Sequence, residues 1–131
     1  MPKVLAEMAN GLNKAMVIGH LGRNPEIRLT SNGQSVANFP VACNRTWKNT
    51  EGKKVTETEW FTIVAWGNLA ETAEKILKKG SHVFIEGRIK SRSWQDNHGN
   101  RQKSFEIVAQ EILLLSESPA NQINDEPSTV E

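Results

Sequence analysis

The stretch from Glu57 to Trp94, ETEWFTIVAWGNLAETAEKILKKGSHVFIEGRIKSRSW, decides the fold. Residues 57–66 alternate, with Phe61 and Ile63 on one face and tryptophans on the other, which indicates a strand with one buried face. Apolar residues then recur at helical spacing, and residues 81–94 alternate again. We therefore expect a strand, one helix and another strand, in that order.

The expected helix has sequence signals at both ends. Asn68 can cap its first turn, and Glu71 follows three residues later, as in a capping box. Gly80 is expected to end the helix, because glycine readily adopts the left-handed conformation found there.

Three further strands are expected outside this stretch. The first covers 14–22. After a break at Pro25 the strand pattern resumes briefly, before the hairpin signal Asn32-Gly33. The others cover 35–47 and 103–115. Three strands, one helix and two strands is the element order of the OB-fold, an all-β, five-stranded barrel whose helix joins strands three and four. We expect a lead-in over 1–11, this domain over 12–116 and a tail over 117–131.

The charge is distributed unevenly along the chain. Residues 117–131 hold four acids and no base, so residues 1–116 carry 16 bases and 11 acids, a net charge of +5. A basic body with an acidic tail is typical of a domain that binds a polyanion, although +5 also occurs in domains that bind none. The tail has two prolines and few apolar residues, so we expect it to be disordered.

Several classes of protein are disfavoured. No apolar run approaches the roughly 18 residues that span a membrane, and the first residues lack a signal-peptide core. The three histidines share no metal-ligand spacing, the single Cys43 cannot form an internal disulfide, and no nucleophile lies beside a base. Asp96 and His98 could bind a metal, but a solvated turn is favoured. We expect no enzyme activity, no cofactor, no metal and no membrane contact, and a cytoplasmic, nucleoid-associated protein.

The strongest functional signal lies on the strand over 81–94. Alternation places three cations and an indole on its outward face: Arg88, Lys90, Arg92 and Trp94. A solvated face is the alternative, but a solvated face does not need a tryptophan. On the preceding strand Trp60 and Trp66 share the outward face, where the alternative role is to cover the barrel end or a subunit contact. Three indoles on the side of a cation row favour stacking of nucleobases.

Trp47 is harder to place than the other tryptophans. Its parity matches that of Phe39 and Val41, so strict alternation would put it inside the barrel. A bulge at Pro40 would reverse the register and expose Trp47. Its exposure on this basis is a hypothesis.

The chain resembles the bacterial-type single-stranded DNA-binding proteins over about residues 12–115. The matching stretches are VIGHLGRNPEIR at 17–28, NGQSVANFPVACNRTW at 32–47, TETEWFTIVAWGNLAE at 56–71 and LKKGSHVFIEGRIKSRSW at 77–94. The resemblance implies an OB-fold, a homotetramer and single-stranded DNA wrapped around the barrels.

The resemblance also implies site residues. The stacking aromatics of the family fall at Trp47, Trp60, Trp66 and Trp94, which favours an exposed Trp47, and Trp66 replaces a more frequent Phe. Family basic contacts match Lys90 and Arg92, with Lys48 and Lys79 suggested by position. Thr62 and Asn68 stand at positions where the family has basic residues, so the phosphate contacts of those two positions are in doubt. The basic side chain of Arg88 could compensate for their loss. The tail lacks the apolar-Pro-Phe tip that recruits replication and repair enzymes, so we expect recruitment to be absent or to use another signal.

The expected function is sequence-independent binding and protection of single-stranded DNA in replication, recombination and repair. Two alternatives stay open: an OB-fold module that binds RNA, and an accessory protein of the same fold that binds proteins. The strand over 14–22 is apolar on both faces, and a barrel buries only one, so we expect a neighbouring subunit to cover the other. A bacterial source is favoured, with phage or organelle origin open.

Overall fold

The computed structural model describes residues 10–116, and the predicted lead-in and tail lie largely or wholly outside this range. The elements are β1 (Ala15–Leu21), β2 (Glu26–Leu29), β3 (Ser35–Lys48), β4 (Lys54–Trp66), α2 (Asn68–Ile76), β5 (His82–Gln95) and β6 (Arg101–Ser116). The predicted order of three strands, one helix and two strands is confirmed, with β2 as the short resumed segment that forms a hairpin with β3. No helix among the described residues is long and apolar enough to span a membrane.

Five strands close into a barrel in the order β1-β5-β6-β4-β3, and β1 returns to pair with β3. The closure involves only His20 opposite Ala42 and Leu21 opposite Val41. Glycine permits this close approach, because a Cβ at Gly19 would lie 2.2 Å from the carbonyl oxygen of Ala42. The predicted OB-fold is confirmed by this topology.

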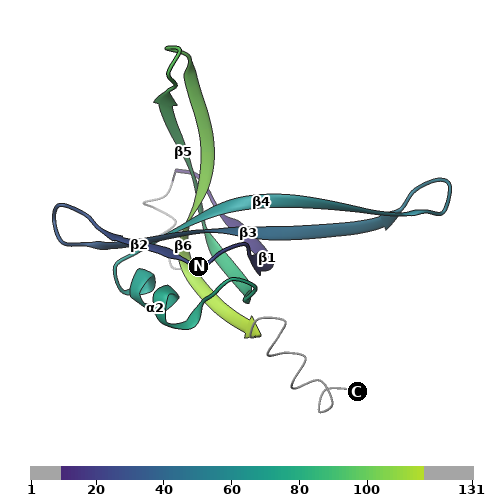
Figure 1. Cartoon of the computed structure of the whole chain (residues 1–131), viewed down its shortest axis with the longest axis horizontal. Coiled ribbons are helices and arrows are strands. Elements are labelled where there is room, and N and C mark those ends of the chain that lie inside the picture. The colour runs from purple at the N-terminus through teal and green to yellow at the C-terminus, as the bar shows by residue number, and fades with distance from the viewer. Residues whose placement is uncertain (1–9, 117–131) are drawn as a thin grey trace.

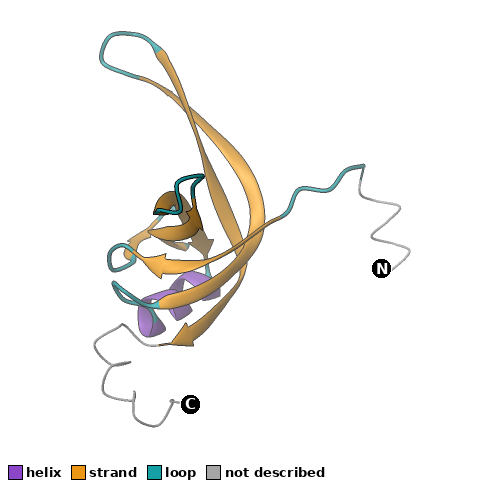
Figure 2. Cartoon of the chain, turned by 90° about the vertical axis from the view of Figure 1, so that its right-hand side faces the viewer, coloured by secondary structure: helices purple, strands orange, loops and turns teal. Residues whose placement is uncertain are grey.

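The core is made of the alternating apolar residues that the sequence predicts. Phe39, Val41, Ile63, Val83 and Ile85 are fully buried inside the barrel. Helix α2 adds Ala70 and Ala73 to this core and packs at one end of the barrel (Figure 2). One end of the barrel is therefore covered by a short helix that connects β4 to β5.

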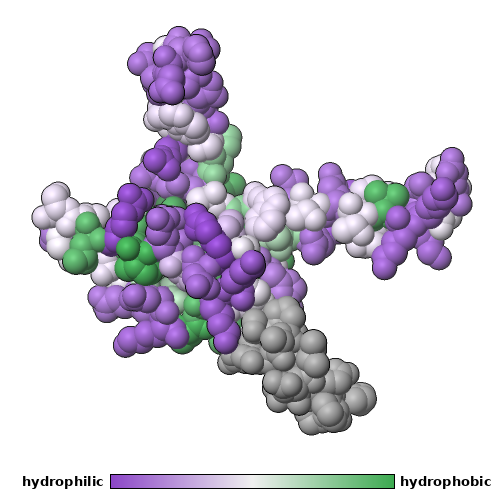
Figure 3. Space-filling model, viewed as in Figure 1, coloured by the Kyte–Doolittle hydropathy of each residue, from purple (hydrophilic) through white to green (hydrophobic). Residues whose placement is uncertain are grey.

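Two hairpins extend beyond the barrel as arms that point in different directions (Figure 1). The β3–β4 arm comprises residues 44–58, and the β5–β6 arm comprises residues 88–106. The face of each arm that continues the barrel interior is called the inner face, and the opposite one the outer face. The tips of both arms are mainly hydrophilic (Figure 3).

The helix ends differ from the prediction. Gly67, with a φ of 62°, occupies the N-cap position, no side chain caps the helix, and Asn68 is already helical. The chain turns from β4 into the helix at this residue. Glycine suits the position because its backbone conformation is costly for other residues. The predicted capping box is therefore wrong. The helix also ends at Ile76, and Gly80 instead lies in the turn before β5 with a φ of 90°.

The predicted bulge at Pro40 is also wrong. The ladder between β3 and β4 runs from Val36 opposite Trp66 to Lys48 opposite Lys54 without a register shift. Pro40 takes part in this ladder opposite Thr62, between the residues of β3 that pair with β2 and those that pair with β1. The alternation of β3 therefore continues unchanged into its arm.

Candidate nucleic-acid interface

Two tryptophans lie on the outer face of β4. Trp60 and Trp66 expose 57% and 41% of their surface, whereas Ile63 and Ala65 on the other face are fully buried. The predicted division of this strand into an aromatic outer face and an apolar inner face is confirmed. Both indoles therefore offer an accessible aromatic surface.

The Trp60 indole lies over Gly22. A Cβ at Gly22 would come within 2.6 Å of Cζ3 and 2.8 Å of Cη2 of Trp60. The amide of Gly22 donates a hydrogen bond to the Pro40 carbonyl at 3.0 Å, which fixes this backbone beside β3. The absence of a side chain at Gly22 therefore sets where the indole rests.

The predicted cation row lies on the outer face of the β5–β6 arm. Arg88, Lys90, Arg92 and Trp94 are all exposed, and the ladder with β6 has no register shift beyond Gly87. The three cations and the indole therefore share one face. Trp94 is 47% exposed and lies close to the turn that closes the arm.

That turn is organised by the Asp96 carboxylate. It accepts hydrogen bonds from the backbone amides of His98 (2.9 Å) and Asn100 (2.8 Å) and from Nε2 of Gln102 (3.1 Å). These donors, the Asn100 amide foremost, lower the pKa of Asp96. The carboxylate stabilises the turn, which agrees with the favoured interpretation of Asp96 and His98 as a turn.

Trp47 is exposed, as the resemblance implies. The cause of its exposure is not the predicted bulge at Pro40. Because the β3–β4 ladder is unbroken, Trp47 stays on the inner face with Phe39 and Val41. It is 38% exposed because the arm carries it past the end of the core. Trp47 and Trp60 therefore lie on opposite faces of the same hairpin.

A cation that sequence reasoning missed accompanies Trp47. The guanidinium carbon of Arg45 lies 4.5 Å from the centroid of the Trp47 ring, within the range of a cation–π contact. The Nη2 atom of Arg45 also lies 3.6 Å from Oε1 of Glu57, its cross-strand partner. The alternation of Arg45 and Trp47 on one face was the signal available in the sequence.

The two cations suggested by position lie in different places. Lys48 is exposed at the end of β3, opposite Lys54 at the start of β4. Lys79 is exposed in the turn before β5, and its amide donates a hydrogen bond of 2.8 Å to Oδ1 of Asn24. This hydrogen bond holds Lys79 beside Asn24, which is two residues from Gly22, and the Trp60 indole lies over Gly22.

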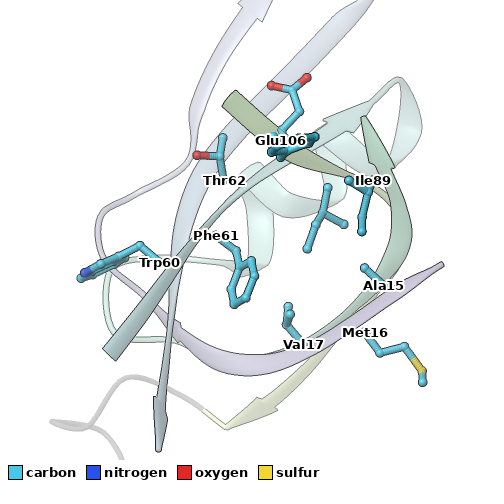
Figure 4. A pocket seen from close by; sticks show the side chains of 10 residues that line it. Ala15, Met16, Val17, Trp60, Phe61, Thr62, Ile89 and Glu106 are labelled. Carbon is cyan, nitrogen blue, oxygen red and sulfur yellow. The ribbon is translucent and has the colours of Figure 1, made fainter. Parts of the chain in front are cut away.

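A cavity of about 600 Å³ opens at the end of the barrel between the arms. Phe61 and Val17 point into it, whereas Trp60 and Met16 point away (Figure 4). Phe105, which sequence reasoning also missed, forms part of its wall and is 62% exposed. Among the described residues no group of three or more His, Cys, Asp and Glu side chains could hold a metal ion.

Comparison with known proteins places this geometry in a family. Residues 12–115 match the model of the single-strand binding protein family. The chain belongs to this family. The chain is 50% identical over 109 residues to single-stranded DNA-binding protein 1 of Chlorobaculum tepidum, a match that covers 82% of this chain and 67% of that protein.

Two other bacterial relatives are slightly more distant. The single-stranded DNA-binding protein of Neisseria meningitidis is 46% identical over 104 residues, covering 79% of this chain and 60% of that protein. Single-stranded DNA-binding protein 1 of Xylella fastidiosa is 40% identical over 111 residues, covering 84% and 82%. The matched region therefore spans between about three fifths and four fifths of these relatives' lengths.

A solved structure agrees with the family assignment. The Plasmodium falciparum SSB in complex with single-stranded DNA superposes with a TM-score of 0.75 at 28% identity, and the match covers 82% of this chain and 98% of that one. The barrel and its family membership are thus supported by both sequence and fold.

Proposed function

We propose that this chain binds single-stranded DNA without regard to sequence, protects it during replication, recombination and repair, and catalyses no reaction. The observation that carries the proposal is the partial exposure of all four tryptophans on β3, β4 and β5, together with the row of three cations that β5 also carries. Tryptophan side chains are highly buried on average, so four indoles that each expose more than a third of their surface favour a planar ligand. Membership of the family, with relatives named as single-stranded DNA-binding proteins, supports the same ligand.

Two kinds of contact carry the proposed binding. Trp47, Trp60, Trp66 and Trp94 stack on nucleobases, each contact contributing about 1–3 kcal/mol. The phosphate backbone is bound by five cations: Lys48, Lys79, Arg88, Lys90 and Arg92. Neither contact depends on base identity, so the binding has no sequence preference. Single strands are preferred over duplex because their base faces are accessible. The binding unit is residues 12–116.

We also propose a homotetramer. The pairing of β1 with β3 involves only two residue pairs, so among residues 10–116 no strand pairs with this edge of residues 15–19. Met16 and Ile18 on its outer face are 63% and 55% exposed. An unpaired edge beside an apolar face is well suited to a second copy of the same strand. Light scattering should give about four times the chain mass of 14.6 kDa, and a monomer mass at micromolar concentration would contradict the proposal.

The three sequence relatives named above come from bacteria, and we propose a bacterial cytoplasm with its nucleoid as the place of action. A titration tests the binding itself. Tryptophan fluorescence should be quenched by an oligo-dT strand and much less by a duplex of equal length. An RNA arm, oligo-rU, separates the alternative: equal affinity for both strands would favour an RNA-binding module, and equal affinity for duplex would contradict stacking.

A further inference from the structure

We propose that Phe105 is a fifth base-stacking residue, placed on the inner face of the β5–β6 arm. The inference rests on the proposed function and adds a DNA contact on the inner face of this arm, whereas Trp94 lies on its outer face. Phe105 is 62% exposed, more than any of the four tryptophans. A large aromatic residue so exposed, on a part of β6 whose ladder with β5 has no register shift, requires an explanation.

The register fixes the face of Phe105. It lies opposite Ser91, two positions from Ile107, which is buried in the core. Phe105 therefore continues the barrel interior outward, whereas Arg92 and Trp94 occupy the outer face of the same arm.

Its charged neighbour points to the ligand. The Nζ atom of Lys103 lies 5.7 Å from the centroid of the Phe105 ring, within the range of a cation–π contact. On the other arm Arg45 lies over Trp47, also on the inner face. Each arm thus presents an aromatic ring with a cation beside it on its inner face. A ring with an adjacent cation suits a base with its phosphate, and the charge argues against a purely apolar occupant.

The surroundings leave room for a base. Phe105 lines the cavity of about 600 Å³ at the barrel end, together with Phe61 and Ile89. This volume lies within the range of about 300–1,000 Å³ typical of ligand sites. The cavity is open, so a base on Phe105 keeps its polar edges in water while its face contacts the ring.

The experiment compares Phe105 variants in oligo-dT titrations, at a salt concentration that brings the wild-type Kd to the micromolar range. Phe105→Ala should weaken binding about 5- to 150-fold, the fold-change that corresponds to one base stack. Phe105→Leu keeps an apolar side chain of similar size but no aromatic face, and should lose nearly as much. Phe105→Trp should bind at least as well as the wild type. Leu29→Ala, at a 71% exposed residue on β2, is the matched control and should change Kd less than twofold.

Light scattering on the same samples separates DNA from a second copy of the chain as the occupant. Weaker binding at unchanged mass supports the proposal. Unchanged affinity of Phe105→Ala, wild-type affinity of Phe105→Leu, or a lower mass for Phe105→Ala would overturn it. Wild type and Trp60→Ala are titrated alongside. If the wild type fails to bind oligo-dT, the proposed function is wrong. If Trp60→Ala weakens binding and Phe105→Ala does not, the inference about Phe105 alone fails.

Discussion

The contact between Gly22 and Trp60 allows the proposed stacking site at Trp60 to be disturbed without a substitution of the indole itself. In Gly22→Ala the new Cβ would meet two ring carbons of Trp60 at 2.6 and 2.8 Å, well inside the optimal carbon separation of about 3.5–4.0 Å. The third neighbour, Cγ of Pro40 at 3.4 Å, is an ordinary contact. One of the two partners at the clash must move.

The indole is the partner that moves. Trp60 is 57% exposed, whereas Gly22 is held by its hydrogen bond to Pro40. Gly22 is not among the glycines with positive φ, so alanine fits its backbone without strain. We therefore expect the stability of Gly22→Ala to stay within about 0.5 kcal/mol of wild type, as for surface substitutions.

The affinity should change more than the stability. A displaced indole loses part of a contact worth about 1–3 kcal/mol, so a loss of about 1 kcal/mol, roughly fivefold in Kd, is expected. The assay is an oligo-dT titration at fixed salt, with fluorescence anisotropy of a labelled strand as readout, because the substitution alters the environment of a tryptophan. Thermal unfolding of the same samples measures stability.

A double-mutant cycle tests the route of the effect. If Gly22→Ala acts through the indole, it should have almost no effect on Kd in a Trp60→Ala background. An equal loss in both backgrounds, or unchanged binding by Gly22→Ala alone, would refute the reasoning. A large drop in unfolding temperature would show that the backbone moves instead of the ring.

Three further predictions follow from the same structure. Gly19→Ala should destabilise the fold by about 1–3 kcal/mol or more, because its Cβ would lie 2.2 Å from the Ala42 carbonyl at the barrel closure, and a normal unfolding temperature would contradict this. Lys90→Gln and Arg92→Gln should each lower the slope of log affinity against log salt by about 0.7, while Lys75→Gln on α2 should leave it unchanged. His20 stacks on His82 with ring centroids 4.4 Å apart, and burial, followed by the charge of His82, lowers the pKa of His20. The unfolded chain therefore binds a proton at His20 more readily, so stability should fall as pH drops through the unfolded value of 6.5 toward the lowered one. Urea midpoints should show a weaker pH dependence in His20→Gln.

The barrel could be predicted from the sequence because its strands have one apolar face. Phe39, Ile63 and Ile85 belong to alternating runs, and all are buried. The start of the helix was misplaced by one residue because Asn68 and Glu71 match a capping box, while the conformation of Gly67 cannot be seen in a side-chain pattern. Local signals therefore located the elements more reliably than their ends.

The arms could be predicted only in part. Polar residues predominate on both faces of the arms, so alternation does not mark where β4 or β6 begins, and β4 starts at Lys54 rather than at Glu57. The face of Trp47 depends on whether the ladder at Pro40 is continuous, which is a property of strand pairing. Phe105 was missed because, in sequence, it resembles an ordinary inward position of a strand, and only the length of the arm exposes it.

The placement of aromatics on both faces of the arms has a consequence for selectivity. Trp47 lies on the inner face of the β3–β4 hairpin and Trp60 on its outer face, so a strand that stacks on both must pass around the hairpin. Duplex DNA has a persistence length of about 50 nm and resists such a bend, and its base faces are already stacked. A single strand can bend around the hairpin and expose successive bases. We therefore expect selection against duplex to arise from the path that the arms impose as well as from the stacking itself.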